Sequence, residues 1–133
     1  MDIKRGDIIY IDLGQHVNSS VQSGRRPCIV ISCNACNTHS PTITVCPLST
    51  KINKKFKKTH VDITKDDVDG YLHKKSVILA EQVCTVDRKD LLHTIGHVKS
   101  TSQIMEQLNK ALYIHFGFIN DQKCHELEAD ISA

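Results

Sequence analysis

Hydrophobic and polar positions alternate in short runs through the first hundred residues. Between residues 7 and 13, Ile9 and Ile11 fall on one face while Ile8 and Tyr10 fall on the other, which is the two-residue period of a strand. Further runs rich in β-branched residues predict strands at 27–32, 42–48, 60–63, 76–80 and 94–98. Several short strands separated by loops predict a compact, strongly curved sheet or a small barrel.

The period changes near residue 100. Ile104, Leu108 and Phe116 recur at helical spacing, and residues 100–103 have the form of a capping box. Gly117 is placed to stop the helix. We therefore expect one helix over about residues 101–116, packed on the sheet, and an α+β, mainly β fold.

Composition indicates how many domains the chain forms and in which compartment we expect the protein. The 133 residues, 40% hydrophobic and 24% charged, suit one soluble domain spanning residues 1–133. No apolar stretch approaches the ~20 residues that cross a bilayer, and the first residues lack the apolar run of a signal peptide. We expect a cytoplasmic protein without a membrane segment. Its net charge of +2 is too small to identify a nucleic-acid partner by itself, so the distribution of charge matters more.

Two arginines between the first two strands form the first candidate site. The segment Ser20–Pro27 contains Arg25 and Arg26 directly before Pro27. Because a proline disfavours the helical backbone for the residue before it, we expect Arg26 to be extended and well positioned. A guanidinium in that place could bind a phosphate through two parallel hydrogen bonds. A solvated basic turn is the alternative interpretation.

The end of the third strand and the loop after it supply further polar groups. Ser49, Thr50 and Lys51 offer donors that suit a phosphoryl oxygen, although serine and threonine also begin many ordinary turns. Five lysines lie within eight residues and could follow a single-stranded nucleic-acid backbone, or belong to a solvated loop. They are Lys51, Lys54, Lys55, Lys57 and Lys58.

Glu81 and Gln82 emerge where the apolar run 77–80 leaves the core. A carboxylate in this position could accept a proton or orient an arginine. A surface glutamate at the end of a strand fits the pattern equally well.

The cysteines and histidines do not assemble into a recognisable metal site. Cys33, Cys36 and His39 have metal-like spacing, but a structural zinc needs four ligands and no second Cys-x-x-Cys exists. We expect no metal and no cofactor. In an intracellular protein the six cysteines should stay reduced, and Cys28, Cys46 and Cys84 lie in strand-like runs where a thiol acts as a small hydrophobe.

Several short blocks of the chain stand in a definite order: Lys4–Leu13, Ser20–Pro27, Ser40–Thr42, Thr59–Val61, Ser76–Gln82, Thr85–Asp87 and Ile95–Gly96. In their order and spacing these blocks resemble the MazF/PemK/Kid family of toxins. The resemblance covers about residues 4–116 and leaves 117–133 as a C-terminal extension. It implies a small SH3-like curved barrel with a C-terminal helix, a homodimer, and cleavage of single-stranded RNA without a metal.

The resemblance also suggests roles for individual residues. It implies that Arg26 is the principal catalytic residue and that Ser49 stands where the family usually has threonine. Cys84 stands where an arginine is frequent, which removes one cation. The expected RNA-binding residues are Ser20, Gln22, Arg25, Thr50, Lys51, Lys54, Lys55, Lys57, Glu81 and Gln82.

The chemistry implied needs no metal, because RNA carries its own nucleophile in the 2′-hydroxyl. Arg26 would stabilise the charged phosphorane with Ser49 as a hydroxyl donor, and Glu81 or His16 would accept the proton. The products would be a 2′,3′-cyclic phosphate or 3′-phosphate and a 5′-hydroxyl.

The last expectations concern the partners of the protein and its alternative functions. The resemblance implies a type II toxin–antitoxin system, in which a separate antitoxin with an acidic, disordered segment neutralises the toxin. Two alternatives remain: a CcdB-like toxin that binds DNA gyrase without nuclease activity, and a catalytically silent RNA binder.

Overall fold

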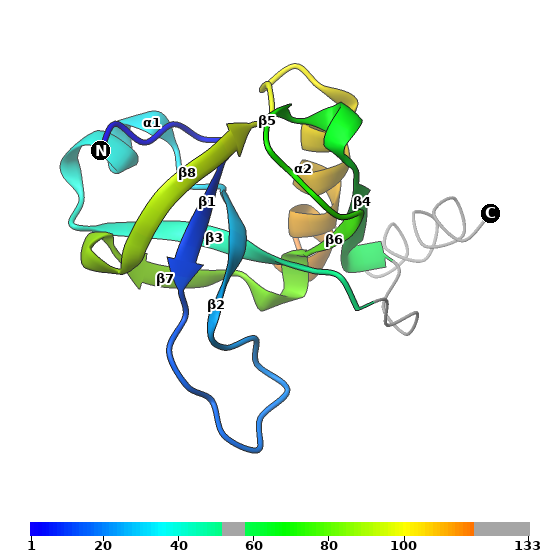
Figure 1. The fold of residues 1–133 in the computed structure, drawn as a ribbon. Helices are drawn as coiled ribbons and strands as arrows, with labels where there is room; N and C mark the ends of the chain where they lie inside the picture. The colour runs from blue at the N-terminus through cyan, green and yellow to red at the C-terminus, as the bar shows by residue number, and fades with distance from the viewer. Residues whose placement is uncertain (52–57, 119–133) are drawn as a thin grey trace.

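The computed structural model describes residues 1–51 and 58–118, which form a strongly curled antiparallel sheet with a long helix packed against it (Figure 1). The strands are β1 (Asp7–Asp12), β2 (Arg25–Val30), β3 (Thr42–Ser49), β4 (His60–Ile63), β5 (Asp69–Gly70), β6 (Ser76–Leu79), β7 (Cys84–Asp87) and β8 (Leu91–His97). The α-helices are α1 (Asn34–His39) and α2 (Gln103–His115). Short 3-10 helices are η2 (Lys65–Asp67), η3 (Ala80–Gln82) and η4 (Arg88–Asp90).

The curl of the sheet comes from β3, which changes partners along its length. The strands follow one another in the order β4-β6-β3-β2-β1-β8-β5, and β7 pairs with β3 outside this path. The first half of β3 pairs with β7, its middle pairs with β2, and its last two residues pair with β6. Because one strand serves three partners, the sheet closes into a half-barrel, which confirms the predicted mainly β fold.

Hydrophobic side chains fill both faces of this sheet. One cluster lies between the sheet and α2 and includes Ile8, Ile29 and Met105. The other cluster, on the opposite face, includes Ile9 and Ile11. The alternation predicted for the first strand is therefore confirmed, because adjacent residues of β1 belong to different clusters.

The strand predictions were right in existence and inexact in their ends. β2 begins at Arg25 instead of residue 27, so Arg26 lies within a strand and not in the loop before it. β3 extends to Ser49, one residue further than predicted. The sequence pattern missed α1, which lies in the expected loop between the strands at 27–32 and 42–48, and it also missed β5 and β7. These elements are short and carry too few apolar residues to show a period.

The C-terminal helix is shorter than the predicted range 101–116. Ser102 is the N-cap, with its hydroxyl accepting a hydrogen bond from Met105 N at 3.2 Å, so the helix is capped by this single serine, two residues after the Ser100 with which the expected capping box began. Gly117 follows the helix with a φ of +70° and donates to Ile114 O, as predicted for a stop. Among the described residues, no helix is long and apolar enough to span a membrane.

Candidate active site

A polar cavity of about 630 Å³ lies between the β1–β2 loop, the end of β3 and η3. The loop extends well away from the sheet, in the lower part of Figure 1. Segments more than 60 residues apart in the sequence meet in this cavity. Of the residues singled out in the sequence, those that line it are Ser20, Gln22, Arg26, Ser49, Thr50, Lys51, Glu81 and Gln82.

Arg26 is fixed by the protein backbone on two sides. Its Nε donates to Ser23 O at 3.1 Å, and its Nη1 donates to Leu48 O at 3.5 Å. Within residues 1–51 and 58–118, its guanidinium forms no salt bridge with a carboxylate. The cavity therefore contains a half-buried, oriented positive charge that an anion could neutralise.

Arg25, its neighbour, has a different environment. Its side chain is exposed and its Nε lies 3.8 Å from Asp12 Oδ2 across the β1–β2 ladder. It is not among the residues that line the cavity. Because consecutive residues of a strand point to opposite faces, β2 directs only one of its two arginines into the site.

Ser49 occupies the end of β3 and is buried. The β2–β3 register ends at the pair of Cys28 with Pro47, and just beyond this pair both Arg26 and Ser49 line the cavity. The Ser49 hydroxyl also closes a turn, donating to Lys51 O at 3.4 Å and accepting from Lys51 N at 3.2 Å. Ser49 therefore fits both of its expected roles, because it begins a turn and also lines the cavity as a possible hydroxyl donor.

A histidine that the sequence analysis did not single out lies beside the cavity carboxylate. His60 Nε2 is 2.9 Å from Glu81 Oε1, and their side chains are 11% and 26% exposed. The other oxygen, Glu81 Oε2, is buried with no hydrogen-bond partner among the described residues. A signal for His60 existed, because it begins a predicted strand inside one of the family-like blocks, but its contact with Glu81 depends on the pairing of β4 with β6.

Gln82 holds the β1–β2 loop in place. Its Oε1 accepts from Gln22 N at 3.0 Å, and its Nε2 donates to Ser20 O at 2.9 Å. Both ends of one side-chain amide thus bind the backbone of a loop about sixty residues away in the sequence. This pair of hydrogen bonds closes one wall of the cavity.

Some sequence-predicted residues lie elsewhere. Lys54, Lys55 and Lys57 lie outside the described residues. His16 is exposed, with Nε2 3.1 Å from Leu13 O, and is not among the residues lining the cavity, which leaves Glu81 as the better placed of the two proposed bases. Within the described part of the chain, no group of three or more His, Cys, Asp or Glu side chains is arranged to hold a metal ion.

Comparisons with known proteins agree with this fold. Residues 4–116 match the family model described as PemK-like, MazF-like toxin of type II toxin-antitoxin system. Since that match spans most of the chain, the protein belongs to this toxin family. The predicted resemblance is confirmed over the predicted range.

Solved structures of toxins share the fold at low sequence identity. An endoribonuclease from a mycobacterial species, in complex with its cognate antitoxin, is 24% identical with a TM-score of 0.70, covering 88% of this chain and 97% of that one. MazF from Deinococcus radiodurans is 18% identical with a TM-score of 0.71, covering 88% and 98%. The Mycobacterium tuberculosis toxin MazF-mt6 is 22% identical with a TM-score of 0.66, covering 84% and 96%. The CcdB-like alternative gains no support from these comparisons.

Proposed function

We propose that this toxin cleaves single-stranded mRNA without a metal ion, by attack of the RNA's own 2′-hydroxyl on the adjacent phosphate. Toxins of this family are endoribonucleases, and similar structures bear that name. The observation that carries the proposal is the Arg26 guanidinium, oriented by two carbonyls and without a carboxylate partner in the described chain, in the same cavity as Ser49 and Glu81.

Arg26 binds the scissile phosphate and stabilises the negative charge that develops on it. A guanidinium suits this task because it stays protonated and presents several N–H donors in a fixed plane. The hydrogen bonds from Nε and Nη1 to carbonyls orient that plane in advance, so little reorganisation accompanies the reaction. Ser49 adds a hydroxyl donor next to it, and Lys51 adds a second positive charge at the cavity edge.

Glu81 accepts the proton of the 2′-hydroxyl, and His60 positions it. The hydrogen bond to His60 occupies Glu81 Oε1 and leaves Oε2 as the oxygen without a partner in the described structure. A carboxylate oxygen that accepts no other hydrogen bond can act as a general base once a hydroxyl comes within reach. The 2′-oxygen forms a bond to phosphorus, the P–O5′ bond breaks, and the leaving 5′-oxygen takes a proton from water. The products are a 2′,3′-cyclic phosphate, which a water molecule can open to a 3′-phosphate, on one fragment and a 5′-hydroxyl on the other.

The proposal includes the partners that such a toxin requires. We expect a homodimer in the cytoplasm and neutralisation by a separate antitoxin with an acidic, disordered segment. The antitoxin complexes of the mycobacterial endoribonuclease and of Deinococcus MazF with MazE support this part of the proposal. A segment rich in carboxylates would be attracted to the same cationic cavity as RNA.

One assay tests the reaction. A labelled single-stranded RNA of mixed sequence is incubated with the purified protein in excess EDTA, and the ends of the fragments are identified. We expect cleavage with 5′-hydroxyl ends. Bound but uncut RNA would favour the silent RNA binder, whereas activity lost in EDTA and restored by zinc would contradict the metal-free mechanism.

Two substitutions distinguish the role of Glu81 as the base from the positioning role of His60. Glu81→Gln keeps a side chain that can bond to His60 but cannot accept a proton, so we expect the single-turnover rate to fall by ~10²–10⁴-fold. The residual rate should no longer decrease on the acidic side, where a carboxylate base becomes protonated. His60→Gln should give a smaller loss and keep that acidic limb. A parental rate and pH profile for Glu81→Gln would exclude Glu81 as the base.

A further inference from the structure

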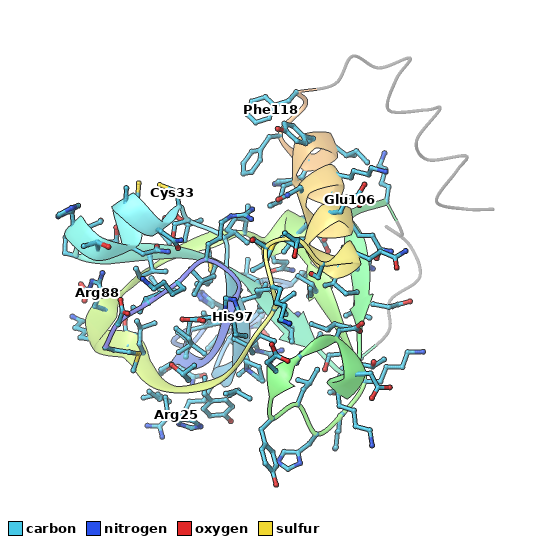
Figure 2. All side chains as sticks on the ribbon, turned by 90° about the horizontal axis from the view of Figure 1, so that it is seen from above. Arg25, Cys33, Arg88, His97, Glu106 and Phe118 are labelled. Atoms are coloured by element: carbon cyan, nitrogen blue, oxygen red, sulfur yellow. The ribbon has the colours of Figure 1, made fainter. Side chains whose placement is uncertain are left out.

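The first turn of α1 presents two cysteines on the surface of the protein. Cys33 is the N-cap of α1, and its Sγ accepts a hydrogen bond from Cys36 N at 3.4 Å. Both side chains belong to exposed residues, and Figure 2 shows Cys33 at the outer edge of α1. The sequence Cys-Asn-Ala-Cys therefore places two accessible thiols on one turn.

The two sulfurs influence each other directly. Hydrogen bonds from the backbone and then the thiol of Cys36 lower the pKa of Cys33. The same thiol–thiol hydrogen bond raises the pKa of Cys36. Because the thiolate is the nucleophile in thiol chemistry, Cys33 is the thiol that reacts first and Cys36 is the one that follows.

The other described cysteines are in less reactive surroundings. Cys28 and Cys46 are completely buried in the sheet, and this burial raises the pKa of Cys46 to about 12 and that of Cys28 still further from its ordinary range. Cys84 is half-buried, and burial also raises its pKa. Within the described chain, the α1 turn thus offers the most accessible thiols with the most readily formed thiolate.

The turn is anchored to the rest of the protein by polar contacts away from the sulfurs. The buried Asn37 donates through Nδ2 to Ser32 O at 2.8 Å, and Asn34 Oδ1 accepts from Arg5 N at 2.7 Å. A disulfide needs Cα atoms about 4.4–6.8 Å apart, a separation that residues three apart in a helical turn meet. Closing the pair therefore requires movement of side chains and little movement of the anchored backbone.

We propose that Cys33 and Cys36 form a reversible disulfide by exchange with a low-molecular-weight disulfide such as oxidised glutathione. The Cys33 thiolate attacks one sulfur of that compound, its S–S bond breaks, and one thiolate leaves. Cys36, after losing its proton, attacks Cys33 Sγ in the mixed disulfide and releases the second thiolate. The two protein thiols lose two electrons, the small disulfide is reduced to two thiols, and the two protons pass to the departing thiolates.

The experiment equilibrates the full-length protein with mixtures of reduced and oxidised glutathione. After acid quenching, the remaining thiols are alkylated, and peptide mass spectrometry identifies the protected cysteines. We expect loss of alkylation at Cys33 and Cys36 together, with an internal disulfide between them that reduced glutathione reverses. Alkylation at both positions under every mixture would overturn the proposal, and so would disulfides only between molecules.

Two single variants test the order of the steps. Cys36→Ser should accumulate one glutathione adduct on Cys33, because the mixed disulfide has no second thiol to resolve it. Cys33→Ser keeps an oxygen acceptor at the N-cap and should react several-fold more slowly at Cys36. Cys84→Ser is the matched control and should leave the internal disulfide unchanged. Equal rates of adduct formation at Cys33 and Cys36 would contradict the assignment of Cys33 as the attacking thiol.

RNA cleavage provides a second measurement, which is independent of the thiol exchange. Figure 1 shows α1 at the opposite end of the sheet from the β1–β2 loop that borders the cavity. We therefore expect Cys33→Ser to cleave RNA at the parental rate, and the disulfide to form equally well in Arg26→Ala. Failure of the thiol exchange and failure of the cleavage mechanism can thus be distinguished.

Discussion

The cavity around Arg26 and the cysteine turn of α1 lie at opposite ends of the same sheet and are built in different ways. The cavity combines the β1–β2 loop, the ends of β2 and β3, a histidine from β4 and a carboxylate from η3. The cysteine turn takes both of its reactive groups from four consecutive residues. One site depends on the whole fold, while the other depends mainly on one helical turn and its anchors.

This difference predicts how each region responds to change. In the cavity, the positions of the charged groups depend on distant hydrogen bonds such as those from Gln82 to the β1–β2 loop. A substitution there should change the reaction through geometry as well as through lost contacts. In the cysteine turn, effects should stay local, because the sulfur atoms contact mainly each other and their own turn.

Apart from loss of the proposed base Glu81, the largest effect is expected from Arg26→Ala. Loss of a pre-oriented charge that stabilises the transition state should reduce the single-turnover rate of RNA cleavage by ~10²–10³-fold. Thermal stability should change little, because the guanidinium lies at the cavity and outside the hydrophobic core. Arg25→Ala is the matched control, since Arg25 is exposed and paired with Asp12, and it should retain most of the activity. If both variants cleave equally fast, Arg26 has no special role.

A smaller loss is expected when the loop is released by Gln82→Ala. The variant lacks both hydrogen bonds to the loop backbone, together worth about 1–3 kcal/mol, and we expect a ~10–10²-fold decrease in kcat/KM. Hydrogen exchange at the Gln22 amide should accelerate, because Gln82 Oε1 is its acceptor. Gln82→Glu keeps that acceptor and should protect the amide. Reduced activity with unchanged exchange would instead assign Gln82 to direct contact with RNA.

Ser49→Ala should lower the single-turnover rate about tenfold. This factor corresponds to the loss of one neutral hydrogen bond worth roughly 1.4 kcal/mol. The effect is smaller than for Arg26 because the hydroxyl already shares its hydrogen bonds with the backbone of Lys51. Ser49→Thr keeps the hydroxyl, adds the methyl that restricts its rotamer, and should remain active. Identical rates for the parent and the alanine variant would remove Ser49 from the mechanism.

The smallest effect is expected from Lys51→Gln. One lost phosphate contact on a single strand should lower the slope of log K against log salt by ~0.7, with little change in the cleavage rate at saturating RNA. Lys89→Gln is the control, because Lys89 is exposed on η4 and away from the cavity lining. Equal slopes for the two variants would mean that Lys51 does not contact the RNA backbone.

Local pattern was enough to predict most of the fold. The alternation of Ile8 and Ile9 in β1, the β-branched run of β3 and the helical spacing of Ile104 and Leu108 all carried over into the structure. Errors arose where an element has little periodic signal of its own. The six-residue α1 caps itself through a cysteine, and β7 exists as a strand because β3 offers it an edge.

The sequence by itself determined the family, the mainly β fold, and the pairing of an arginine with a proline that fixes its backbone. It also placed Arg26, Ser49 and Glu81 among the candidates, because each stands at the boundary of an apolar run. Only the tertiary structure decided that β2 points Arg26 into the cavity and Arg25 away from it, that His60 meets Glu81, and that His16 lies outside. These outcomes depend on strand register and on contacts between residues far apart in the sequence, whereas local periodicity carries no information about which distant strand becomes a neighbour.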